Sequence, residues 1–320
     1  MQQLLRKRKC LLAIETSCDD TSIAIINNDQ LVANIVISSA DEQTKYGGIV
    51  PELAARKHED NIIRAFKLAQ TKANIDINDI DMIAYTNYPG LRVSLNVGEI
   101  FAYTLCLLLK LEPIKINHIY AHIFSFWDFK SKINFPFISL IASGGTTSIF
   151  LVKSVKDIIL LNETQDDAIG ECYDKIAREL DLGYPGGPKI DKLYDSRKTN
   201  INFLMQKNAH NDKSFSFSGL KTAVLNYINS SKMKKQNIDI VAIASSFQKT
   251  AINMLLEKLF FYTKQYQCQA ISIGGGVAAN SLLRQAIRHY FKNMDIYLPD
   301  ITLCGDNAAM IAIYAYLITK

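Results

Sequence analysis

One pattern occurs twice in the chain and constrains its fold more than any other feature. Residues 11–26 read LLAIETSCDDTSIAII, and residues 137–152 read FISLIASGGTTSIFLV, so the two segments align without a gap. In each copy, two apolar runs separated by a polar turn predict a pair of strands. Two such hairpins, one opening each half of the chain, indicate a duplicated fold, and chance similarity between amphipathic hairpins is the alternative. The identical positions are Ser17/Ser143, Thr21/Thr147, Ser22/Ser148 and Ile23/Ile149.

The remaining segments alternate strands with helices, which is typical of α/β proteins. We predict helices over residues 52–72 and 94–111, a polar start running into a helix within residues 162–182, and a strand over residues 82–86. A further strand over residues 270–273 leads through a glycine triplet into a helix over residues 277–290.

Actin, Hsp70 and the sugar kinases combine two such halves and hold a nucleotide between them. We therefore predict an α/β, two-lobed actin/Hsp70/sugar-kinase-like fold with a duplicated core. The lobes are expected at residues 1–130 and 131–320, with the active site in the cleft between them.

The composition is that of an ordinary globular protein, with 320 residues, 48% hydrophobic and 21% charged. The net charge of +5 permits a polyanionic partner without requiring one. Basic residues gather at residues 6–9, 56–57 and 232–235. These clusters could contact phosphates, and solvated loops and helix ends are the alternative reading.

The cysteines and apolar segments point to a cytoplasmic protein. The six cysteines are scattered singly without a CxxC pair, which argues against a zinc ribbon or a redox dithiol and fits a reducing compartment. The apolar stretch over residues 100–109 is too short to span a bilayer of about 30 Å. We expect no membrane association.

Two histidines have the spacing of a metal clamp. His118 and His122 stand at i and i+4, which on a helix places both imidazoles on one face. A third ligand is needed, and Asp306, in the turn before the last helix, is a candidate. Two histidines and one carboxylate leave coordination positions open and suit iron(II) or zinc. The alternative is a pair of helix histidines satisfied by the backbone. HExxH is absent because Ile119 occupies the position of its glutamate, which argues against a zinc-protease mechanism.

Carboxylates and glycine turns mark further candidate positions. Asp19 and Asp20 lie in the first hairpin turn, and Glu171 and Asp174 stand one helical turn apart, where they could face a cleft. The pair Asp166 and Asp167 is read as helix N-terminal charge that stabilises the dipole. Glycine-rich turns at residues 143–145 and 274–276 could present backbone N–H groups to phosphate, and tight strand–helix packing is the alternative for the second.

The motifs taken together closely resemble one family. In order they read IETSCDDTSIAI, GGIVPELAARKH, NHIYAH, SGGTTSIF, DDAIGECYDKIAR, GYPGGPKID, FSFSGLKTA, GGGVAANSLLR and CGDNAAMIA. They are similar to TsaD, the tRNA N6-adenosine threonylcarbamoyltransferases formerly labelled O-sialoglycoprotein endopeptidases. The resemblance runs from about residue 11 to residue 316.

The resemblance implies specific roles for residues of this chain. His118, His122 and Asp306 would bind one divalent metal, Fe²⁺ or alternatively Zn²⁺. Residues 15–19 match the first hairpin of the family and would lie near the reacting groups. We choose Asp19 among them as the candidate base. The positions that would hold the adenylate substrate are Ile141, Ala142, Ser143, Gly144, Gly145, Asp174, Gly187, Asp191 and Asn280.

The chain departs from the family pattern at two places. Thr146 takes the variable position of the SGGHT or SGGNT motif. In the loop that the family writes TxGPGLxGS, Tyr88 and Val93 replace glycines. Because glycine adopts positive φ without cost, we expect these two replacements to reshape the turn.

The implied reaction joins threonylcarbamoyl-AMP and tRNA at N6 of adenosine 37, in tRNAs that read codons starting with A. The implied partners are a TsaB-type paralogue and a TsaE-type ATPase. Two other classes stay open at this point: a kinase or ATPase of the same fold, and a degenerate homologue that acts as a scaffold. A peptidase reading rests on the old family label alone.

Overall fold

The structure, a computed structural model, describes residues 10–46, 48–203 and 215–320. The basic cluster at residues 6–9 lies outside these ranges. The chain divides into two compact units, each described by itself here. Unit 1 comprises the chain up to Lys132 together with Gly305–Lys320, and unit 2 comprises Ile133–Cys304.

Each unit is built on a five-stranded sheet, and the two sheets have the same topology. The strand order is β3-β2-β1-β4-β5 in unit 1 and, read from the corresponding edge, β8-β7-β6-β9-β10 in unit 2. In both sheets the first three strands pair antiparallel and the last two join in parallel. The repeated hairpins are β1–β2 and β6–β7, so the duplicated core predicted from the sequence is confirmed.

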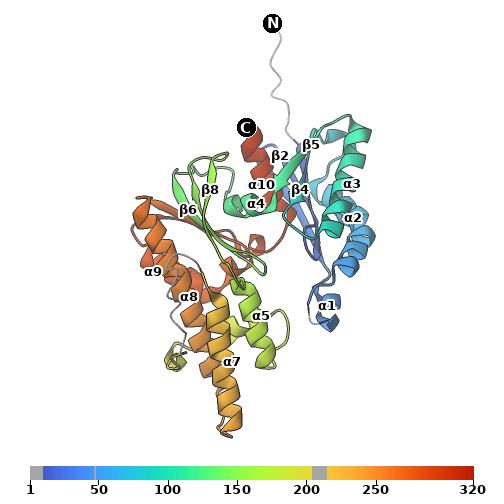
Figure 1. Cartoon of the computed structure of the whole chain (residues 1–320). Helices are drawn as coiled ribbons and strands as arrows, with labels where there is room; N and C mark the ends of the chain where they lie inside the picture. The colour runs from blue at the N-terminus through green and yellow to red at the C-terminus, as the bar shows by residue number, and fades with distance from the viewer. Residues whose placement is uncertain (1–9, 47, 204–214) are drawn as a thin grey trace. The chain divides into compact units, whose positions relative to one another are not determined.

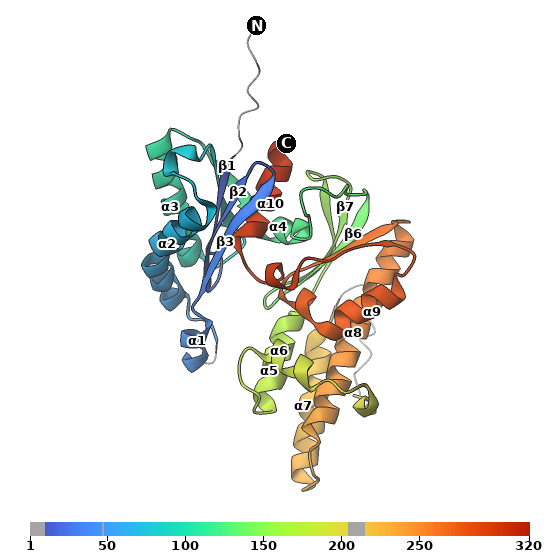
Figure 2. The same cartoon turned by 180° about the vertical axis from the view of Figure 1, so that it is seen from behind.

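In unit 1 helices cover both faces of the sheet. Helices α2 and α3 lie on one face, whereas α4 and α10 lie on the other (Figures 1 and 2). The elements are β1 Cys10–Glu15, β2 Asp20–Asn27, β3 Gln30–Ser38, α1 Ala40–Gln43, η1 Thr44–Tyr46, α2 Pro51–Ala73, η2 Ile77–Asp79, β4 Met82–Tyr88, α3 Arg92–Leu109, β5 Pro113–Asn117, α4 His118–Phe124 and α10 Ala308–Thr319.

Unit 2 packs its helices and its sheet around a second apolar core, in which the long helix α8 contacts β6 and α9. The elements are β6 Phe137–Ala142, β7 Thr147–Val152, β8 Ile158–Glu163, α5 Ile169–Glu179, α6 Gly186–Leu193, η3 Ser196–Lys198, α7 Phe217–Met233, α8 Ile240–Gln265, β9 Ala270–Gly274, η4 Gly276–Ala279, α9 Ser281–Tyr290, β10 Asp295–Tyr297 and η5 Ile301–Leu303.

The apolar patterning explains where the central strands and the last helix lie. All residues of β1 and of β6 are buried, as expected for central strands with covered faces that read as continuous apolar runs. Helix α10 (AAMIAIYAYLIT) is apolar on every side and buried from Ala308 to Tyr316, which is typical of a core helix.

Three details differ from the sequence-based expectations. Gly305–Lys320 pack with unit 1 rather than with the second half, because α10 buries its apolar surface against β1, β2 and α4. Within residues 162–182, the polar start expected to lead into a helix includes the end of strand β8 at Glu163, and helix α5 begins only at Ile169. Helix α9 begins at Ser281, since residues 276–279 form the short helix η4.

Within the described residues, α3 is the one helix long and apolar enough to cross a membrane by length and composition. Six of its residues are buried in the structure, and the helix packs against α2 and β4. Helix α3 therefore contributes these residues to the core of unit 1, and much of its apolar surface stays exposed.

Candidate functional site

The two histidines of the predicted clamp lie on the short helix α4. The side chain of Asn117 caps this helix by accepting hydrogen bonds from the N–H groups of Ile119 and Tyr120, at 2.9 and 3.1 Å. Because the cap follows strand β5 directly, the helix begins at His118 and presents His122 one turn later on the same face. Both side chains are almost fully buried.

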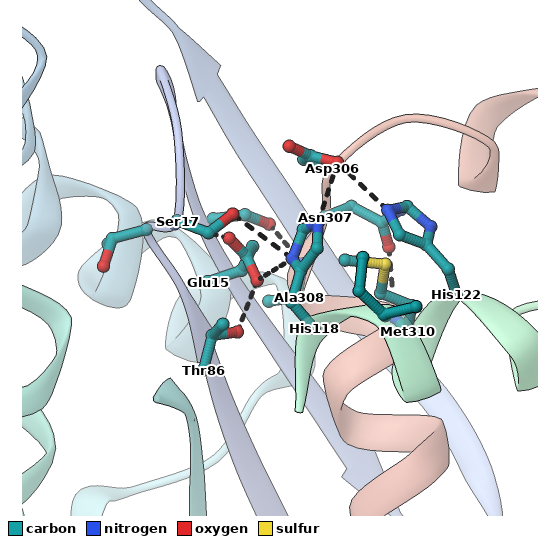
Figure 3. A network of polar contacts seen from close by, with 12 residues as sticks. Glu15, Ser17, Thr86, His118, His122, Asp306, Asn307, Ala308 and Met310 are labelled. Atoms are coloured by element: carbon teal, nitrogen blue, oxygen red, sulfur yellow. Dashed lines mark hydrogen bonds and ion pairs between the residues drawn. The ribbon is translucent and has the colours of Figure 1, made fainter. Parts of the chain in front are cut away.

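Asp306 reaches the same point from the other end of the chain. Asn307 caps α10 by accepting from the N–H of Met310 at 3.2 Å, and the N–H of Ala308 donates to Ser22 Oγ at 2.8 Å. These contacts anchor the start of α10 to strand β2. The carboxylate of Asp306 is thereby held beside α4, as Figure 3 shows.

The three side chains converge on one point within unit 1. Oδ1 of Asp306 lies 3.1 Å from Nε2 of His122 and 3.5 Å from Nε2 of His118. Each residue offers one ligand atom, and these atoms all lie within 4.8 Å of one another. The predicted trio of ligands is therefore brought together by the fold.

A fully buried carboxylate stands behind His118. Oε2 of Glu15 lies 3.1 Å from Nδ1 of His118, and Ser17 Oγ lies 3.2 Å from the same nitrogen. Glu15 also accepts from the Thr86 hydroxyl and, at 2.5 Å, from the N–H of Ser17. Because an ionised carboxylate can only accept, Nδ1 of His118 carries a proton and Nε2 faces Asp306.

The charges of this cluster are strongly coupled. Burial alone would lower the pKa of His118, but the carboxylates of Glu15 and Asp306 raise it to about 10. Burial alone would raise the pKa of Asp306, yet the charge on His118 and hydrogen bonds from both histidines hold it below its usual range. Burial, and the neighbouring charge of His118, lower the pKa of His122.

The donor set fits a divalent metal ion. Two imidazole Nε2 atoms and one carboxylate oxygen match the ligands that iron(II) and zinc prefer. A carboxylate behind a ligating histidine fixes the orientation of its ring, as Glu15 does for His118. Nδ1 of His122 is buried without a hydrogen-bond partner among the described residues. The contact of His122 with Asp306 is therefore made through Nε2.

The β1–β2 turn carries Asp19, the candidate base, next to this cluster. Burial, and then the charge of Asp306, raise the pKa of Asp19. The turn is held by His58 of α2, whose ring lies 2.8 Å from Thr21 Oγ1 and 3.0 Å from the carbonyl of Cys18. The backbone oxygen of Asp19 accepts from Ser39 Oγ at 2.8 Å. The turn is thus fixed by contacts from two sides.

The loop in which the chain departs from the family pattern buttresses the same turn. The N–H of Leu91 donates to the carbonyl of Ser17 at 2.7 Å, and a Cβ on Gly90 would meet that carbonyl at the same distance. Tyr88 and Val93, which replace glycines, both have negative φ. The backbone at these two positions therefore accommodates side chains, and the expectation that the replacements reshape the turn relative to the family stays a prediction.

The predicted adenylate residues belong to unit 2, and the first group forms the β6–β7 turn. Ile141 and Ala142 are buried at the end of β6, whereas Gly144 and Gly145 are exposed. The turn is closed by the N–H of Ser143, which donates to the carbonyl of Thr146 at 2.8 Å. A Cβ on either glycine would meet no atom within 4 Å, so a ligand can approach this backbone closely.

Asp174 of helix α5 contacts the start of helix α6, in which Gly187 is the second residue. Oδ1 of Asp174 accepts from the N–H of Gly186 at 2.7 Å, and burial raises the pKa of this carboxyl. Gly187 is half-buried, and no atom lies within 4 Å of the place where its Cβ would be. Asp174 thus has a structural contact, and Gly187 offers open backbone beside it.

Asp191 and Asn280 are joined through a residue that the sequence analysis did not select. Gln248 of α8 donates from Nε2 to Oδ1 of Asp191 at 3.0 Å and accepts from Nδ2 of Asn280 at 2.9 Å. Ser281 donates to the same carboxylate from its N–H at 3.0 Å and from its hydroxyl at 2.8 Å. Three separate elements therefore meet in one polar network.

The acidic pair before α5 has a structural role. Asp166 accepts from the N–H of Phe217 at 3.0 Å and from Ser216 Oγ at 2.8 Å, which satisfies the start of α7. Asp167 pairs with Lys175 at 3.0 Å and with Lys221. These contacts bind α5 to α7, in addition to any effect on the dipole of α5.

The sequence placed Glu15 near the reacting groups only as part of residues 15–19, without a role of its own, and it did not mark Gln248 or His58 as site residues. Glu15 closes a strand of otherwise buried apolar residues, and Gln248 interrupts the apolar stripe of Ala244, Ala251 and Leu255. A polar residue in a buried stripe is a signal, because a buried polar group needs a partner. The sequence does not state which partner that is.

Comparisons with known proteins agree with this architecture. The family model described as TsaD, tRNA N6-adenosine threonylcarbamoyltransferase, matches residues 30–313. A relative of that name from Ureaplasma urealyticum serovar 10 is 48% identical, covering 99% of this chain and 97% of the relative. Relatives of the same name from Thermosipho africanus and Clostridium beijerinckii are 45% and 44% identical, each covering 97% of this chain and 94% and 92% of their own lengths.

Two solved structures share the fold at low sequence identity. Full-length HypF in its phosphate- and nucleotide-bound form has a TM-score of 0.66 at 14% identity, and covers 99% of this chain. The chain spans 48% of HypF, about half of its length. The activator of 2-hydroxyisocaproyl-CoA dehydratase from Clostridium difficile, with bound ADPNP, has a TM-score of 0.54 at 16% identity, covering 97% of this chain and 94% of the activator. These likenesses confirm the predicted actin/Hsp70/sugar-kinase-like fold class.

The family match and the curated relatives both extend over most of the chain, so they include the histidine pair of unit 1 and the glycine turns of unit 2. They do not support the kinase and peptidase readings that the motifs left open. The chain belongs to the TsaD family of tRNA N6-adenosine threonylcarbamoyltransferases, which are transferases that modify tRNA.

Proposed function

We propose that this chain transfers the threonylcarbamoyl group of threonylcarbamoyl-AMP to N6 of adenosine 37, in tRNAs that read codons starting with A. The observation that carries this proposal is the convergence of His118, His122 and Asp306 on one point, with Glu15 behind His118, in a chain of this transferase family. A kinase of the same fold has no need of such a donor set.

His118, His122 and Asp306 would hold one divalent cation, which we propose to be Fe²⁺, with Zn²⁺ as the alternative. When bound, such a cation supplies a Lewis acid that orients and polarises the oxygens of the threonylcarbamoyl group. Glu15 and Ser17 hold the ring of His118 so that Nε2 points toward Asp306. This arrangement fixes the direction of one of the three donor atoms, Nε2 of His118.

The chemistry requires placement more than activation. The donor is a mixed carbamoyl–phosphate anhydride, and the N6 lone pair is delocalised into the adenine ring, so the acceptor is a weak nucleophile. N6 attacks the carbamoyl carbon, the bond from that carbon to the phosphate oxygen breaks, and the electron pair leaves with AMP. Holding the two reactants in contact provides the effective concentration.

We propose that Asp19 takes the proton that N6 loses. Its carboxylate stands in the β1–β2 turn next to Asp306, and the contacts of His58 and Ser39 with that turn keep it in place. A fixed turn is a suitable mount for a base, since proton transfer requires hydrogen-bond distance in the reacting complex.

We further propose that unit 2 binds the adenylate part of the donor. Ile141, Ala142, Ser143, Gly144, Gly145, Asp174, Gly187, Asp191 and Asn280 are the residues assigned to this task. The open backbone of the β6–β7 turn supports phosphate binding, because exposed glycine N–H groups can approach an anion closely. The target base on the tRNA has to leave its stack, which a single-stranded loop permits.

We propose tRNA, a TsaB-type paralogue and a TsaE-type ATPase as partners in the cytoplasm, without membrane association. Helix α3 supports a protein partner, because Ile100, Leu107 and Leu108 are 67%, 82% and 66% exposed. Of the basic clusters proposed to contact tRNA, Lys57 and Lys232 form ion pairs with Glu42 and Glu179 at 2.7 Å each. Contacts with phosphate at those two lysines would have to compete with these carboxylates.

A transfer assay tests the proposal. Purified protein is incubated with unmodified tRNA, synthetic threonylcarbamoyl-AMP, Fe²⁺ and the proposed partners, and the digested nucleosides are analysed by mass spectrometry. We expect threonylcarbamoyl-adenosine with the wild-type protein and its loss with His118→Ala. Absence of the product, while a homologous enzyme works under the same conditions, would contradict the transferase proposal and favour the degenerate homologue.

A further inference from the structure

The inference concerns Gln248, a fully buried residue in the middle of α8. It lies on the apolar face of that helix, between Ala244 and Ala251, where a hydrophobic side chain would pack without any need for a partner. A buried amide that lacks hydrogen bonds is costly, so its presence in this stripe calls for a specific use.

Gln248 uses its amide to join two elements that carry proposed adenylate residues. Its Nε2 donates to Oδ1 of Asp191 on α6 at 3.0 Å. Its Oε1 accepts from Nδ2 of Asn280, the residue that caps α9, at 2.9 Å. One side chain therefore holds both residues in place.

The direction of each hydrogen bond in this network is determined. Asp191 can only accept when ionised, so Gln248 must turn its NH₂ group toward Asp191 and its oxygen toward Asn280. Asn280 must then donate to Gln248, which leaves its Oδ1 for the N–H of Leu283 at 2.9 Å. The carboxylate at one end and the helix N-terminus at the other end demand the same orientation, so the network has one consistent arrangement.

This arrangement sets what the two residues offer to a ligand. Asp191 accepts three hydrogen bonds from Gln248 and Ser281, and a carboxylate has about four acceptor positions, so about one stays open. Asn280 uses one of the two hydrogens on Nδ2 within the described network, and the second can be donated. The pair thus presents an acceptor from Asp191 and a donor from Asn280.

We propose that Gln248 is a positioning residue that fixes the hydrogen-bond polarity of Asp191 and Asn280, so that the pair recognises a nucleoside through a hydroxyl donor and a ring-nitrogen acceptor. The inference rests on the adenylate donor of the proposed function. It adds a residue that touches no ligand itself and acts through two residues that would.

Ser246, two positions earlier on the same helix, provides the matched comparison. It is also buried, its hydroxyl accepts from the N–H of Ile201 at 3.1 Å, and it donates to the carbonyl of Lys198 at 3.3 Å. Ser246→Ala therefore removes two hydrogen bonds from α8 without touching Asp191 or Asn280. A general loss of polar contacts in α8 would appear in both variants.

The test measures the affinity of the full-length protein for AMP by isothermal titration calorimetry. Gln248→Glu keeps the shape of the side chain but places a second carboxylate 3.0 Å from Asp191 in place of a donor, where both cannot stay ionised. Gln248→Met keeps the length and removes both hydrogen bonds. We expect the Kd for AMP to rise about tenfold or more in Gln248→Met, to rise with pH in Gln248→Glu as the carboxyl pair loses the proton that restores the donor, and to change less than about twofold in Ser246→Ala.

A second readout separates positioning from general destabilisation. Adding Asp191→Asn to Gln248→Glu reverses donor and acceptor across the same contact, so we expect the effects of the two changes on AMP affinity to be less than additive. In the transfer assay, Gln248→Met should raise the KM for the donor while kcat and the metal content stay within about twofold of the wild-type values.

The outcomes distinguish this inference from the proposed function. If the wild-type protein binds AMP and a folded Gln248→Met protein binds it equally well, the positioning role is overturned and the proposed function stands. An additive double variant would also overturn it. If the wild-type protein does not bind AMP, the adenylate assignment itself fails and the inference fails with it.

Discussion

The two repeated hairpins pair their strands in the same register, but their turns carry different side chains. In β1–β2 the residue that ends the first strand is Glu15, paired with Ser22, whereas in β6–β7 the corresponding position is Ile141, paired with Ser148. The turn of the first hairpin contains Cys18 and Asp19 where the second contains Gly144 and Gly145. One turn is acidic and adjoins two histidines, while the other is neutral and exposes backbone.

Under the proposed function, one backbone arrangement would serve two kinds of ligand. Carboxylates at the end of β1 and in the turn after it would provide a place for a cation, because Glu15 contacts His118 and Asp19 adjoins Asp306. Glycines at the corresponding place after β6 leave the backbone open, where N–H groups would meet an anion. The side chains of the turn, rather than the path of the strands, would then determine the sign of the charge that each hairpin favours.

In each unit, a glycine that follows the fourth strand packs closely against the repeated hairpin. A Cβ on Gly90 would lie 2.7 Å from the carbonyl oxygen of Ser17, and a Cβ on Gly275 would lie 2.4 Å from that of Ala142. Real side chains do not approach this closely, so both positions require glycine for contact with the turn. Besides their topology, the two units therefore share this support of the hairpin turn by a glycine.

The largest effect is expected from the metal ligands. His118→Ala removes one of three ligands, so we expect metal affinity to fall by more than about a hundredfold and transfer to be lost, with AMP binding unchanged. Metal analysis after reconstitution with Fe²⁺ measures the first effect. His289→Ala, at an exposed histidine of α9, is the control and should retain the metal. Full metal occupancy in His118→Ala would break the assignment of the metal to unit 1.

Glu15→Gln sharpens the comparison, because it removes the charge at the end of β1 while keeping the size of the side chain. A carboxylate that orients a ligating histidine contributes to affinity, so we expect the metal Kd to rise about 10- to 100-fold. Competition with a chelator measures it. Glu99→Gln is the matched control, since Glu99 lies on α3 and accepts from the Tyr85 hydroxyl at 2.9 Å, away from the cluster. Equal metal affinity in both variants would exclude a role for Glu15.

Gly275→Ala tests the shared backbone support in unit 2. Gly275 has φ of +86° and its added Cβ would clash with Ala142, so we expect the free energy of unfolding to fall by about 2 kcal/mol or more. Chemical denaturation measures this. The neighbouring Gly276 has no atom within 4 Å of an added Cβ, and Gly276→Ala should stay close to the wild-type protein. If both variants are equally stable, the close approach is not what requires glycine at this position.

Gly144→Ala has the smallest expected effect on the structure, and it tests only the proposed binding of phosphate by the β6–β7 turn. Its Cβ would meet no protein atom, so stability should change by less than about 1 kcal/mol. Because the methyl group stands where phosphate would approach the backbone, we expect AMP to bind a few-fold more weakly by calorimetry. Gly219→Ala on α7, with a nearest neighbour at 3.5 Å, controls for the substitution itself. Unchanged AMP affinity would place the phosphate elsewhere.

The sequence predicted the parts that depend on local patterns. The hairpin repeat predicted the duplicated core, because strand–turn–strand periodicity is readable in a single chain. The i, i+4 spacing predicted that His118 and His122 share a face, since a helix fixes that relation. Asp306 was selected for its turn and residue type, and the fold brings it to the histidines from the other end of the chain.

The remaining features depend on long-range packing. Nothing local assigns α10 to unit 1, because an apolar helix can pack on any core. The contact of Glu15 with His118 spans strands and helices far apart in sequence, as does the bridge made by Gln248. Such partners are set by topology, so a single sequence shows that a buried polar group needs a partner without showing which one it has.

The most direct test of the account measures two affinities on two variants. Metal binding and AMP binding are determined for the wild-type protein, for His118→Ala and for Asp191→Ala. We expect a crossover: His118→Ala loses the metal and keeps AMP, while Asp191→Ala keeps the metal and loses AMP. If His118→Ala loses both ligands, or if Asp191→Ala loses the metal while still folded, the division of the two tasks between the units is contradicted.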